Sequence, residues 1–528
     1  MNPRGAPDML DFRADKKNRG LSPLKGHMPL LHFQEALKLL RSDPVLKEAR
    51  GAVKRQGLYL VGGVLRNLAL GRPLPPDYDF VYDGRTALLA GKFASRLGGS
   101  AFILDKETLS YRVAARVNGA PCTIDISSVK DGGISCDLKS RDFTVDALAV
   151  GVAELFTEDA PRLFDPCGGL DDAACLRLRM NSRKAFLEDP LRCLRAVRIA
   201  RQYGLKITPD TAAAVKKASP LLTGVAPERV REELTAIFRC VGASRAVSAL
   251  YYLGVIKAIL PEALHWRDAG GVEPPQGYDL LAHSLKTLDE GEAVIDEAMD
   301  TAGKAFPGLA ENLSRHFLCP AGSLDRKVFF KMAAFFHDAG KPLTVKLNPL
   351  RGRTSGKLSF KGHDREGAVL INGIFRRLRF SGRVAAEIAN LVKNHHRIFA
   401  LAKLKKRSDR AKAHLLRAAD GVDGIWKGAA VDLLLLSVAD VRATRGGEDR
   451  RFLKFVNEML RFYYEHFLKK RAAPLMNGRE IMRVFKIPEG PLVGEIIKKI
   501  SEGIEAGVVK DKKEAKAYVR KRLKAAGC

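Results

Sequence analysis

The sequence predicts an α+β protein, in which a strand-containing region over about residues 28–155 precedes a long helical remainder. In the first region, short runs rich in Val, Ile, Leu and Tyr are bounded by Gly, Pro or Asp, which is the pattern of strands. From about residue 170, apolar residues recur at helical spacing, as in Pro190–Tyr203 and Pro227–Val241. The expected strands are Leu58–Val61, Tyr78–Tyr82, Ala101–Leu104, Tyr111–Val117 and Thr123–Val129.

Composition indicates several globular domains and a polyanionic partner. The 528 residues exceed the usual size of one domain. Ninety Lys and Arg residues stand against sixty Asp and Glu residues, which gives a net charge of +30. Each phosphate that such a surface neutralises releases condensed counterions. Nucleic acid is therefore the expected partner, with an anionic membrane surface as the alternative.

The sequence shows no feature of secretion or membrane insertion. No window approaches roughly 18 consecutive apolar residues, and residues 1–20 are polar and charged, without the apolar segment of a secretory signal. The eight cysteines are scattered and form no C-x-x-C pair, so neither a zinc knuckle nor a redox motif is indicated. We expect a reduced, cytoplasmic protein with no membrane partner, and the sequence does not fix its oligomeric state.

Changes in pattern divide the chain into predicted segments. Residues 1–27 are expected to form a disordered basic tail, residues 28–155 a head with strands, and residues 156–268 a helical neck. A Gly- and Pro-rich stretch, GGVEPPQG (270–277), marks a boundary. Residues 278–450 form a second helical domain with most of the histidines, and residues 451–528 a basic helical region suited to RNA.

A glycine pair and two aspartates stand close together in the head. Gly62 and Gly63 separate the first strand from a helix that begins near Val64, and glycine lets backbone N–H groups approach a phosphate there. Asp77 and Asp79 lie two apart on the next strand, so both carboxylates point to one face. Such a pair can hold two Mg²⁺ ions about 4 Å apart, which would activate a 3′-hydroxyl and neutralise leaving pyrophosphate. Either pattern alone is common in ordinary turns.

Further polar positions follow along the chain. Asp125, in the strand TIDISSV, is the candidate third carboxylate, and a solvent-facing strand residue is the alternative. In SRDFTVDALAV (140–150), a polar pair near a predicted helix start is placed to position ribose or triphosphate, and an ordinary capped helix is the alternative. FLEDPLRCLRAVRIARQYGL (186–205) opens a helix with acidic residues and presents arginines three apart on one surface. The residues concerned are Arg141, Asp142, Asp189, Arg192 and Arg195.

Six ordered motifs resemble one family. GGVLRN, DYDF, RDFTVDALA, DPCGGLDD, EDPLRCLRAVR and PERVREEL follow one another as in class II tRNA nucleotidyltransferases (CCA-adding enzymes) and bacterial poly(A) polymerases. The resemblance covers most of residues 55–520. It implies a polymerase-β-like nucleotidyltransferase head with a small mixed sheet, followed by all-α neck, HD and tail domains. The neck, residues 156–268, would bind nucleotide and RNA. It also implies a Mg²⁺-dependent enzyme that adds C and A from CTP and ATP to tRNA 3′ ends without a nucleic-acid template.

The resemblance also implies roles for particular residues. Asp77 and Asp79 match the catalytic, metal-binding carboxylates. Asp189 and Arg192 match the pair that presents an amino-acid template to the incoming base, and a carboxylate and a guanidinium do offer opposite hydrogen-bond polarity to a Watson–Crick edge. The other nucleotide-binding positions of the matched motifs are Gly62, Gly63, Arg66, Arg141, Asp142 and Arg195.

Three positions depart from the family's pattern. Asn67 stands where Asp is usual after GG-x-x-R, Ser140 replaces the first Arg of RRDFT, and Asp146 replaces the Asn of RDFT-x-NA. The metal-binding and template positions are kept. We therefore expect the departures to tune phosphate affinity or the choice of nucleotide.

Histidines and aspartates form a second set in the helical remainder. Their order, His then His-Asp then Asp, resembles the HD phosphohydrolases, and two further histidines are placed to support a second metal. Imidazole and carboxylate suit divalent metals, so we expect a bound metal and a secondary phosphohydrolase activity, with a degenerate scaffold as the alternative. The expected metal ligands are His283, His337, Asp338, His363, His395 and Asp440.

The motifs leave the product open. A poly(A) polymerase, a CC-adding enzyme and an A-adding enzyme share them, although no dense Arg/His run near residues 85–115 indicates an enterobacterial-type poly(A) polymerase. Two other hypotheses make the HD domain the main catalyst or make the chain a non-enzymatic RNA-binding module. Intact Asp77 and Asp79 argue against the first, and two metal-type clusters argue against the second.

Overall fold

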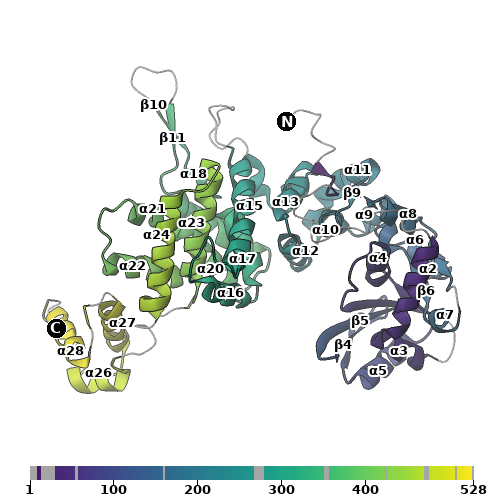
Figure 1. The fold of residues 1–528 in the computed structure, drawn as a ribbon, viewed down its shortest axis with the longest axis horizontal. Coiled ribbons are helices and arrows are strands. Elements are labelled where there is room, and N and C mark those ends of the chain that lie inside the picture. Colours follow the sequence, from purple (N-terminus) through teal and green to yellow (C-terminus); the bar gives the residue numbers. More distant parts are fainter. Residues whose placement is uncertain are drawn as a thin grey trace. The chain divides into compact units, whose positions relative to one another are not determined.

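The computed structural model describes residues 9–13, 30–53, 57–158, 161–266, 279–349, 356–421, 425–468, 475–505, 508–509 and 511–525. The chain divides into two compact units, Met1–Ile259 and Leu260–Cys528, which can be followed by colour in Figure 1. The candidate nucleotide-transfer residues lie in the first unit, and all the candidate HD ligands lie in the second.

A seven-stranded mixed sheet organises the first unit, in the order β3-β4-β5-β2-β1-β6-β7. Strands β2 and β5 run parallel, and every other neighbouring pair is antiparallel. Five of the strands were predicted from the sequence. The strands are β1 (Leu58–Val61), β2 (Asp77–Tyr82), β3 (Ser100–Asp105), β4 (Ser110–Val117), β5 (Ala120–Ser128), β6 (Ala149–Gly151) and β7 (Leu163–Phe164).

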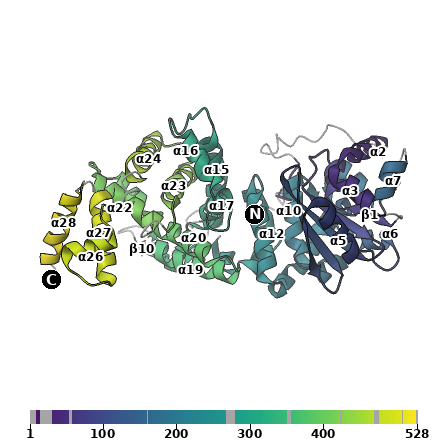
Figure 2. The same ribbon diagram turned by 90° about the horizontal axis from the view of Figure 1, so that it is seen from below.

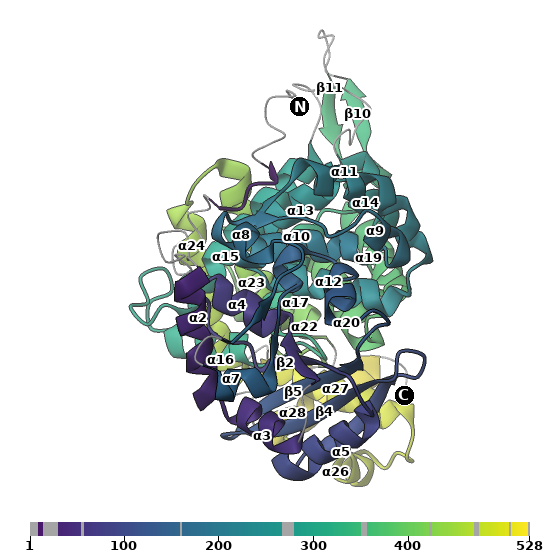
Figure 3. The same cartoon turned by 90° about the vertical axis from the view of Figure 1, so that its right-hand side faces the viewer.

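The parallel β2–β5 pair depends on a crossover connection. Helix α5 (Thr86–Leu97) and the β3–β4 hairpin supply it, and Figure 3 shows α5 running beside β4. Phe80 of β2 and Phe93 of α5 are buried with ring centroids 5.6 Å apart. The remaining helices of this part are α2 (Leu30–Leu39), α3 (Pro44–Ala52), α4 (Gly63–Ala69), α6 (Ile134–Lys139) and α7 (Val152–Thr157).

The helix predicted to start near Arg141 is wrong. Ser140 instead ends α6, a single 3-10 turn, η4, covers Thr144–Asp146, and Ala149–Gly151 forms β6 beside β1. The run Ala147–Val150 is fully buried. A short run that is apolar at every position fits a buried strand as well as a helix, so periodicity alone could not separate the two.

The neck is mainly helical, as predicted, and adds one short parallel strand pair, β8 (Arg177–Leu178) with β9 (Lys206–Ile207). Helix α10 packs against α12 and α13 because its apolar residues, among them Leu194 and Val197, share one buried face. The neck helices are α8 (Gly169–Ala174), α9 (Lys184–Glu188), α10 (Arg192–Tyr203), α11 (Pro209–Ala218), α12 (Pro227–Arg239), α13 (Ala243–Tyr252) and α14 (Val255–Ile259).

Part of the predicted disordered tail is ordered. Phe12 is fully buried, with the guanidinium carbons of Arg201 and Arg245 5.8 and 5.7 Å from its ring centroid. Asp11 forms a β-bridge with Lys206. The expectation for residues 1–27 therefore fails over residues 9–13, because one aromatic side chain supplies enough apolar surface to fix a short segment. The rest of that range lies outside the described residues.

The second unit surrounds one buried helix, α23 (Ala429–Arg445), in which Ala429–Ala439 are all buried. Helices α15, α17, α20, α22 and α24 pack against it, and Figure 2 shows α15 and α17 near it. The helices are α15 (Leu280–Met299), α16 (Ala310–Leu318), α17 (Arg326–Phe336), α18 (Lys341–Thr344), α19 (His363–Arg377), α20 (Gly382–Asn394), α21 (Arg397–Ala402), α22 (Asp409–Asp420) and α24 (Arg450–Phe462).

Two smaller features complete this unit. A hairpin of β10 (Lys346–Pro349) and β11 (Gly356–Ser359) interrupts the otherwise helical HD region. The C-terminal helices α26 (Gly478–Phe485), α27 (Pro491–Glu505) and α28 (Lys512–Ala525) share their own apolar core, which includes Ile481, Ile496 and Val519. Among the described residues, no helix has both the length and the hydropathy to cross a bilayer.

Candidate functional site

Three carboxylates meet on the two parallel strands of the head. Asp77 and Asp79 open β2, and Asp79 lies in register with Asp125 of β5. Residues two apart on one strand, and in-register neighbours on adjacent strands, share a face of the sheet. Burial raises the pKa of Asp79 above its ordinary value, and the nearby Asp125 adds to this effect. Carboxylate oxygens grouped in this way are ligands that suit a hard divalent cation.

Arg112 of β4 was not identified from the sequence. It lies opposite Asp125 in the antiparallel β4–β5 pair and donates from Nε and Nη2 to the two carboxylate oxygens, at 2.7 Å each. Both side chains are partly exposed, 40% and 30%. Metal ligation by Asp125 would therefore exchange these hydrogen bonds for a cation. The hairpin register that pairs the two residues is the feature that could have revealed Arg112.

The glycine turn adjoins this carboxylate group. Gly62 has φ +69°, and a Cβ there would lie 2.9 Å from Oδ2 of Asp79 and 3.4 Å from Nη1 of Arg141. Both the left-handed conformation and the close approach require glycine. The predicted residues Gly62, Asp79 and Arg141 are thus brought together.

Arg66 lies in a buried contact within the protein. Its guanidinium donates to Asp146 at 2.5 Å and to the Tyr203 hydroxyl at 2.6 Å, and it lies 4.2 Å from the Tyr203 ring centroid. The Arg66 and Asp146 side chains are only 12% and 8% exposed. The structure therefore places this predicted nucleotide contact between α4, η4 and α10, where Nη1 and Nη2 donate to those two residues and Nε is buried without a hydrogen-bond partner among the described residues.

Two of the three departures from the family pattern flank Arg66. Asp146 is its anionic partner, and Asn67 presents Oδ1 3.4 Å from Nη2 of Arg66. The amide of Asn67 also donates to the Pro73 carbonyl at 2.6 Å. The third departure, Ser140, donates to the Asp137 carbonyl and lies 2.8 Å from Nζ of Lys130.

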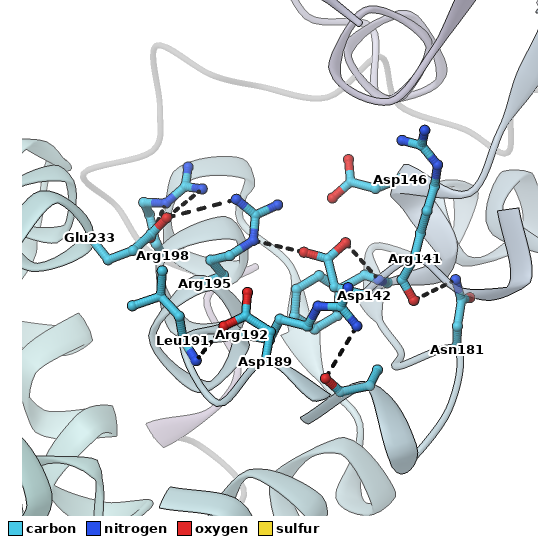
Figure 4. A network of polar contacts seen from close by, with 12 residues as sticks. Arg141, Asp142, Asp146, Asn181, Asp189, Leu191, Arg192, Arg195, Arg198 and Glu233 are labelled. Carbon is cyan, nitrogen blue, oxygen red and sulfur yellow. Dashed lines mark hydrogen bonds and ion pairs between the residues drawn. The ribbon is translucent and has the colours of Figure 1, made fainter. Parts of the chain in front are cut away.

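A polar network links the head to α10 and α12 (Figure 4). Asp142 is buried and accepts from Nε of Arg195 at 2.8 Å. Burial acts to raise the pKa of Asp142, but the charge and hydrogen bond of Arg195 outweigh it and hold that pKa below its ordinary value. Glu233 of α12 pairs with Arg198 at 2.6 Å and with Arg195 at 3.7 Å. Asp142 and Arg195 therefore fix α10 against the loop that follows α6.

The predicted template pair lies at the start of α10. Asp189 follows α9, and one of its oxygens accepts from Arg229 of α12 at 2.8 Å. Arg192 donates to the Ala185 carbonyl at 3.1 Å. Asp189 and Arg192 remain partly exposed, 26% and 20%. Arg229 was not singled out from the sequence, although it lies in the motif PERVREEL and shares a face of α12 with Glu233 four residues later.

All six predicted HD ligands meet around Asp338. One carboxylate oxygen, Oδ2, lies 3.4 and 3.2 Å from Nε2 of His283 and His337. The other, Oδ1, lies 3.4 Å from Nε2 of both His363 and His395. Asp440 of α23 approaches the first pair, at 3.3 Å from His283 and 3.7 Å from His337. Asp338 thus stands between two histidine pairs.

The imidazole tautomers fit metal ligation. Nδ1 of His337, His363 and His395 lies 3.0, 2.7 and 2.5 Å from a backbone carbonyl three residues earlier. A carbonyl can only accept, so each Nδ1 carries a proton, and Nε2, which faces the cluster, is the nitrogen that can bind a metal. The geometry groups Asp338 with His283 and His337, and again with His363, His395 and His396. Nitrogen and carboxylate donors in such groups suit divalent transition metals.

Two further residues lie at this cluster. Lys341 lies 2.5 Å from Oδ2 of Asp338, and His396 adds a ring nitrogen on the exposed side of the second group. Burial acts to raise the pKa of Asp440, but the hydrogen bond from His283 and the charge of His337 outweigh it and hold that pKa at about 2. The carboxylates are therefore ionised and able to bind metal at neutral pH.

Comparison with known proteins identifies the domains that hold the two candidate sites. A family model described as the poly A polymerase head domain matches residues 58–179, a probable RNA and SrmB-binding site of polymerase A matches residues 204–266, and an HD domain matches residues 309–425. The A-adding tRNA nucleotidyltransferase of Deinococcus radiodurans is 30% identical over 473 residues, 88% of this chain and 95% of that protein. The CC-adding tRNA nucleotidyltransferase of Thermus thermophilus is 29% identical over 87% of this chain and 92% of its own.

Solved structures share the fold at lower identity. A CCA-adding enzyme in complex with ATP matches with a TM-score of 0.58 and 18% identity over 95% of this chain and all of that chain. The Thermotoga maritima CCA-adding enzyme bound to tRNA matches with a TM-score of 0.54 and 19% identity, over 93% and 98%. A polymerase-type head followed by a helical neck and an HD domain defines an RNA nucleotidyltransferase. The chain belongs to the tRNA nucleotidyltransferase and poly(A) polymerase family.

Proposed function

We propose that this enzyme adds C and A residues from CTP and ATP to the 3′ end of tRNA without a nucleic-acid template. The observation that carries the proposal is the carboxylate group Asp77, Asp79 and Asp125 on two paired strands. The relatives named above, which add A or CC to tRNA, support tRNA as the acceptor. CCA addition is the leading product, and CC addition, A addition and poly(A) synthesis are the alternatives.

Phosphoryl transfer at this site is a simple displacement. The RNA 3′-oxygen bonds to the α-phosphorus of the nucleotide while the bond to the bridging oxygen breaks, and pyrophosphate leaves. Asp77, Asp79 and Asp125 would hold Mg²⁺, which when bound lowers the pKa of the attacking hydroxyl and neutralises the leaving group. Gly62 allows the turn before α4 to lie against Asp79 without a side chain between them.

The neck residues would choose the base. Asp189 and Arg192 are partly exposed at the start of α10 and offer an acceptor and donors to a Watson–Crick edge. Arg229 holds one oxygen of Asp189, which leaves its carboxylate in a fixed orientation. The Asp142–Arg195 pair positions this helix relative to the carboxylate strands.

The experiment uses purified protein, Mg²⁺ and three RNAs: tRNA lacking CCA, tRNA ending in CC, and an unstructured RNA. Each receives CTP, ATP or both, and products are separated on a sequencing gel. Three additions to the first tRNA and one to the second establish CCA synthesis. Arrest after CC, or extension of only the CC-ending tRNA, establishes a partial enzyme, and long A tails on all three establish a poly(A) polymerase. No extension of any RNA refutes the proposal.

The second unit supports a further function, metal-dependent phosphoester hydrolysis. Its basis is the placement of Asp338 between two histidine pairs. Such a set would hold one divalent ion on His283, His337, Asp338 and Asp440, and a second on Asp338, His363 and His395. Lys341 lies where it would neutralise a bound phosphate.

Hydrolysis of bis-p-nitrophenyl phosphate with Mn²⁺, Ni²⁺ or Mg²⁺ tests this second function. Asp77→Ala should abolish nucleotide transfer and leave hydrolysis unchanged, because the two clusters lie in different compact units. Asp338→Asn should do the reverse. If no metal supports hydrolysis by the unaltered protein, the HD domain is a scaffold.

A further inference from the structure

A row of aromatic side chains runs outward from the HD cluster. The ring of His395 lies 4.7 Å from that of His396, which lies 5.6 Å from Phe399. Phe399 of α21 stacks on Phe452 of α24, with ring centroids 5.5 Å apart and planes at 27°. His396 is exposed, and both phenylalanines are half-buried. We call His396, Phe399 and Phe452 the aromatic row.

The chain around this row is strongly basic. Residues 393–412 hold eight Lys and Arg residues against one acidic residue, Asp409. The cationic side chains are Lys393, Arg397, Lys403, Lys405, Lys406, Arg407, Arg410 and Lys412. Lys403, Lys405, Lys406 and Arg410 are exposed. The three lysines lie on the loop between α21 and α22, and Arg410 lies in the first turn of α22 (Asp409–Asp420). We call residues 403–412 the basic loop.

The aromatic row and the basic loop are joined. His396 directly precedes α21, Phe399 lies within it, and Lys403 follows its last residue. The guanidinium of Arg407 lies 4.6 Å from the ring centroid of Phe455, one turn along α24 from Phe452. Exposed Leu404, 47% accessible, adds apolar surface among the lysines. Helix α21 also packs against α22, so the loop is anchored at both ends.

Half-exposed aromatic rings among cations are the features that bind single-stranded nucleic acid. Bases stack on the rings, whereas the cations follow the phosphates, and neither contact depends on sequence. An anionic membrane would bind the Lys and Arg side chains. It would not explain why aromatic rings lead from them inward to a cluster of metal ligands. A free mononucleotide could bind at the HD cluster, but it is too short to reach the basic loop as well.

We propose that the HD site acts on the end of a single-stranded RNA, with the last nucleotides held by the aromatic row and the basic loop and a terminal phosphoester placed at Asp338. This inference rests on the phosphohydrolase function proposed above and names its substrate class. The step is hydrolysis: a water oxygen bonds to phosphorus, the bond from phosphorus to a ribose oxygen breaks, and that oxygen takes the proton. No oxidant or reductant takes part.

Photo-crosslinking locates the RNA without depending on activity. A short single-stranded RNA with 4-thiouridine next to a terminal 3′-phosphate is irradiated with the metal-free full-length protein, and crosslinked peptides are identified by mass spectrometry. Crosslinks within residues 393–412 or at Phe452 are expected. Phe399→Ala and the pair Lys405→Glu with Lys406→Glu should each lower their yield at least fivefold. Lys47→Glu with Lys106→Glu, at two exposed positions of the head, is the matched control and should change nothing.

Kinetics then separate this inference from the function on which it rests. The Lys405→Glu/Lys406→Glu variant should lose at least tenfold in kcat/KM for RNAs ending in a 3′-phosphate or a 2′,3′-cyclic phosphate, and stay within twofold on bis-p-nitrophenyl phosphate. If the unaltered protein hydrolyses none of these, the phosphohydrolase function itself fails. Hydrolysis of the small ester with no preference for RNA over a mononucleotide, or binding to anionic vesicles in place of RNA, overturns the inference alone.

Discussion

Asp338 is the residue on which the HD cluster depends, because its two oxygens face different histidine pairs. We expect the unaltered protein to retain two Mn²⁺ ions per chain after dialysis. Asp338→Asn should lose both, since an amide is a weaker ligand than a carboxylate. Asp440→Asn should lose one, because Asp440 approaches the first histidine pair, His283 and His337. Elemental analysis measures the ratio, with His414→Ala as the control. Equal losses in the two Asp variants would contradict this assignment.

Glu387 gives a pH dependence to the stability of the second unit. Its side chain is 1% exposed, and burial raises its pKa to about 7, from an ordinary value of 4.5. The folded state therefore binds this proton more tightly than the unfolded state does. The resulting stabilisation is complete below pH 4.5 and is lost as pH rises towards 7.

Replacing Glu387 with Gln should remove this dependence. At pH 8 the variant should be more stable than the unaltered protein by up to about 3 kcal/mol, the equivalent of the pKa difference. At pH 4.5 the two should unfold alike. Calorimetry of the full chain at both pH values measures the effect, and Glu311→Gln, an exposed position, should show none. A variant that is destabilised at pH 8 would show that Glu387 is needed there in its charged form.

At the scale of elements, the Arg66–Asp146 ion pair joins α4 to η4, and the hydrogen bond from Arg66 to Tyr203 joins α4 to α10. Asp146→Asn leaves a buried guanidinium without its anionic partner, a change that typically costs about 3–5 kcal/mol. We expect a lower Tm and a fall of about 10- to 100-fold in kcat for nucleotide transfer, because the elements that carry Asp79 and Asp142 lose their alignment.

The family pattern suggests the matching rescue. Asn67→Asp would place a carboxylate near Nη2 of Arg66, at the position of the present amide oxygen. In the double variant it should restore part of the stability, although the hydrogen bond to the Pro73 carbonyl is lost. A double-mutant cycle on Tm and kcat measures the coupling. Strictly additive effects would show that positions 67 and 146 do not act through Arg66.

How far the sequence predicts this protein also depends on the scale. Strands such as Leu58–Val61 and Thr123–Val129 were found within a few residues, because each is long enough to show its own pattern. Strand β6 was missed because three buried residues acquire strand geometry only by pairing with β1. The contacts Arg66–Asp146 and Asp189–Arg229 join residues that are 80 and 40 positions apart. No local pattern contains those pairings, so motifs located the candidate residues but not their partners.

At the scale of the whole molecule, the net charge of +30 should govern RNA affinity. The Kd for tRNA should rise steeply with salt, with a slope of log Kd against log salt of about 4 or more, because several phosphates exchange counterions for Lys and Arg. Filter binding between about 50 and 300 mM KCl measures this slope. CTP affinity should vary far less. A flat response would mean that the basic surface does not contact the RNA backbone.

The burial of Phe12 between two arginines has a practical meaning for anyone who shortens this chain. A shortened chain that started at residue 28, where the sequence predicts that the folded part begins, would lack the ring against which Arg201 and Arg245 pack. Loss of a buried phenylalanine typically lowers the free energy of unfolding by about 3–5 kcal/mol. Here the neck would be destabilised, because it holds both arginines. A deletion that ended before Met9 would spare the neck, so comparing the Tm of the two truncated proteins would show where the first unit begins.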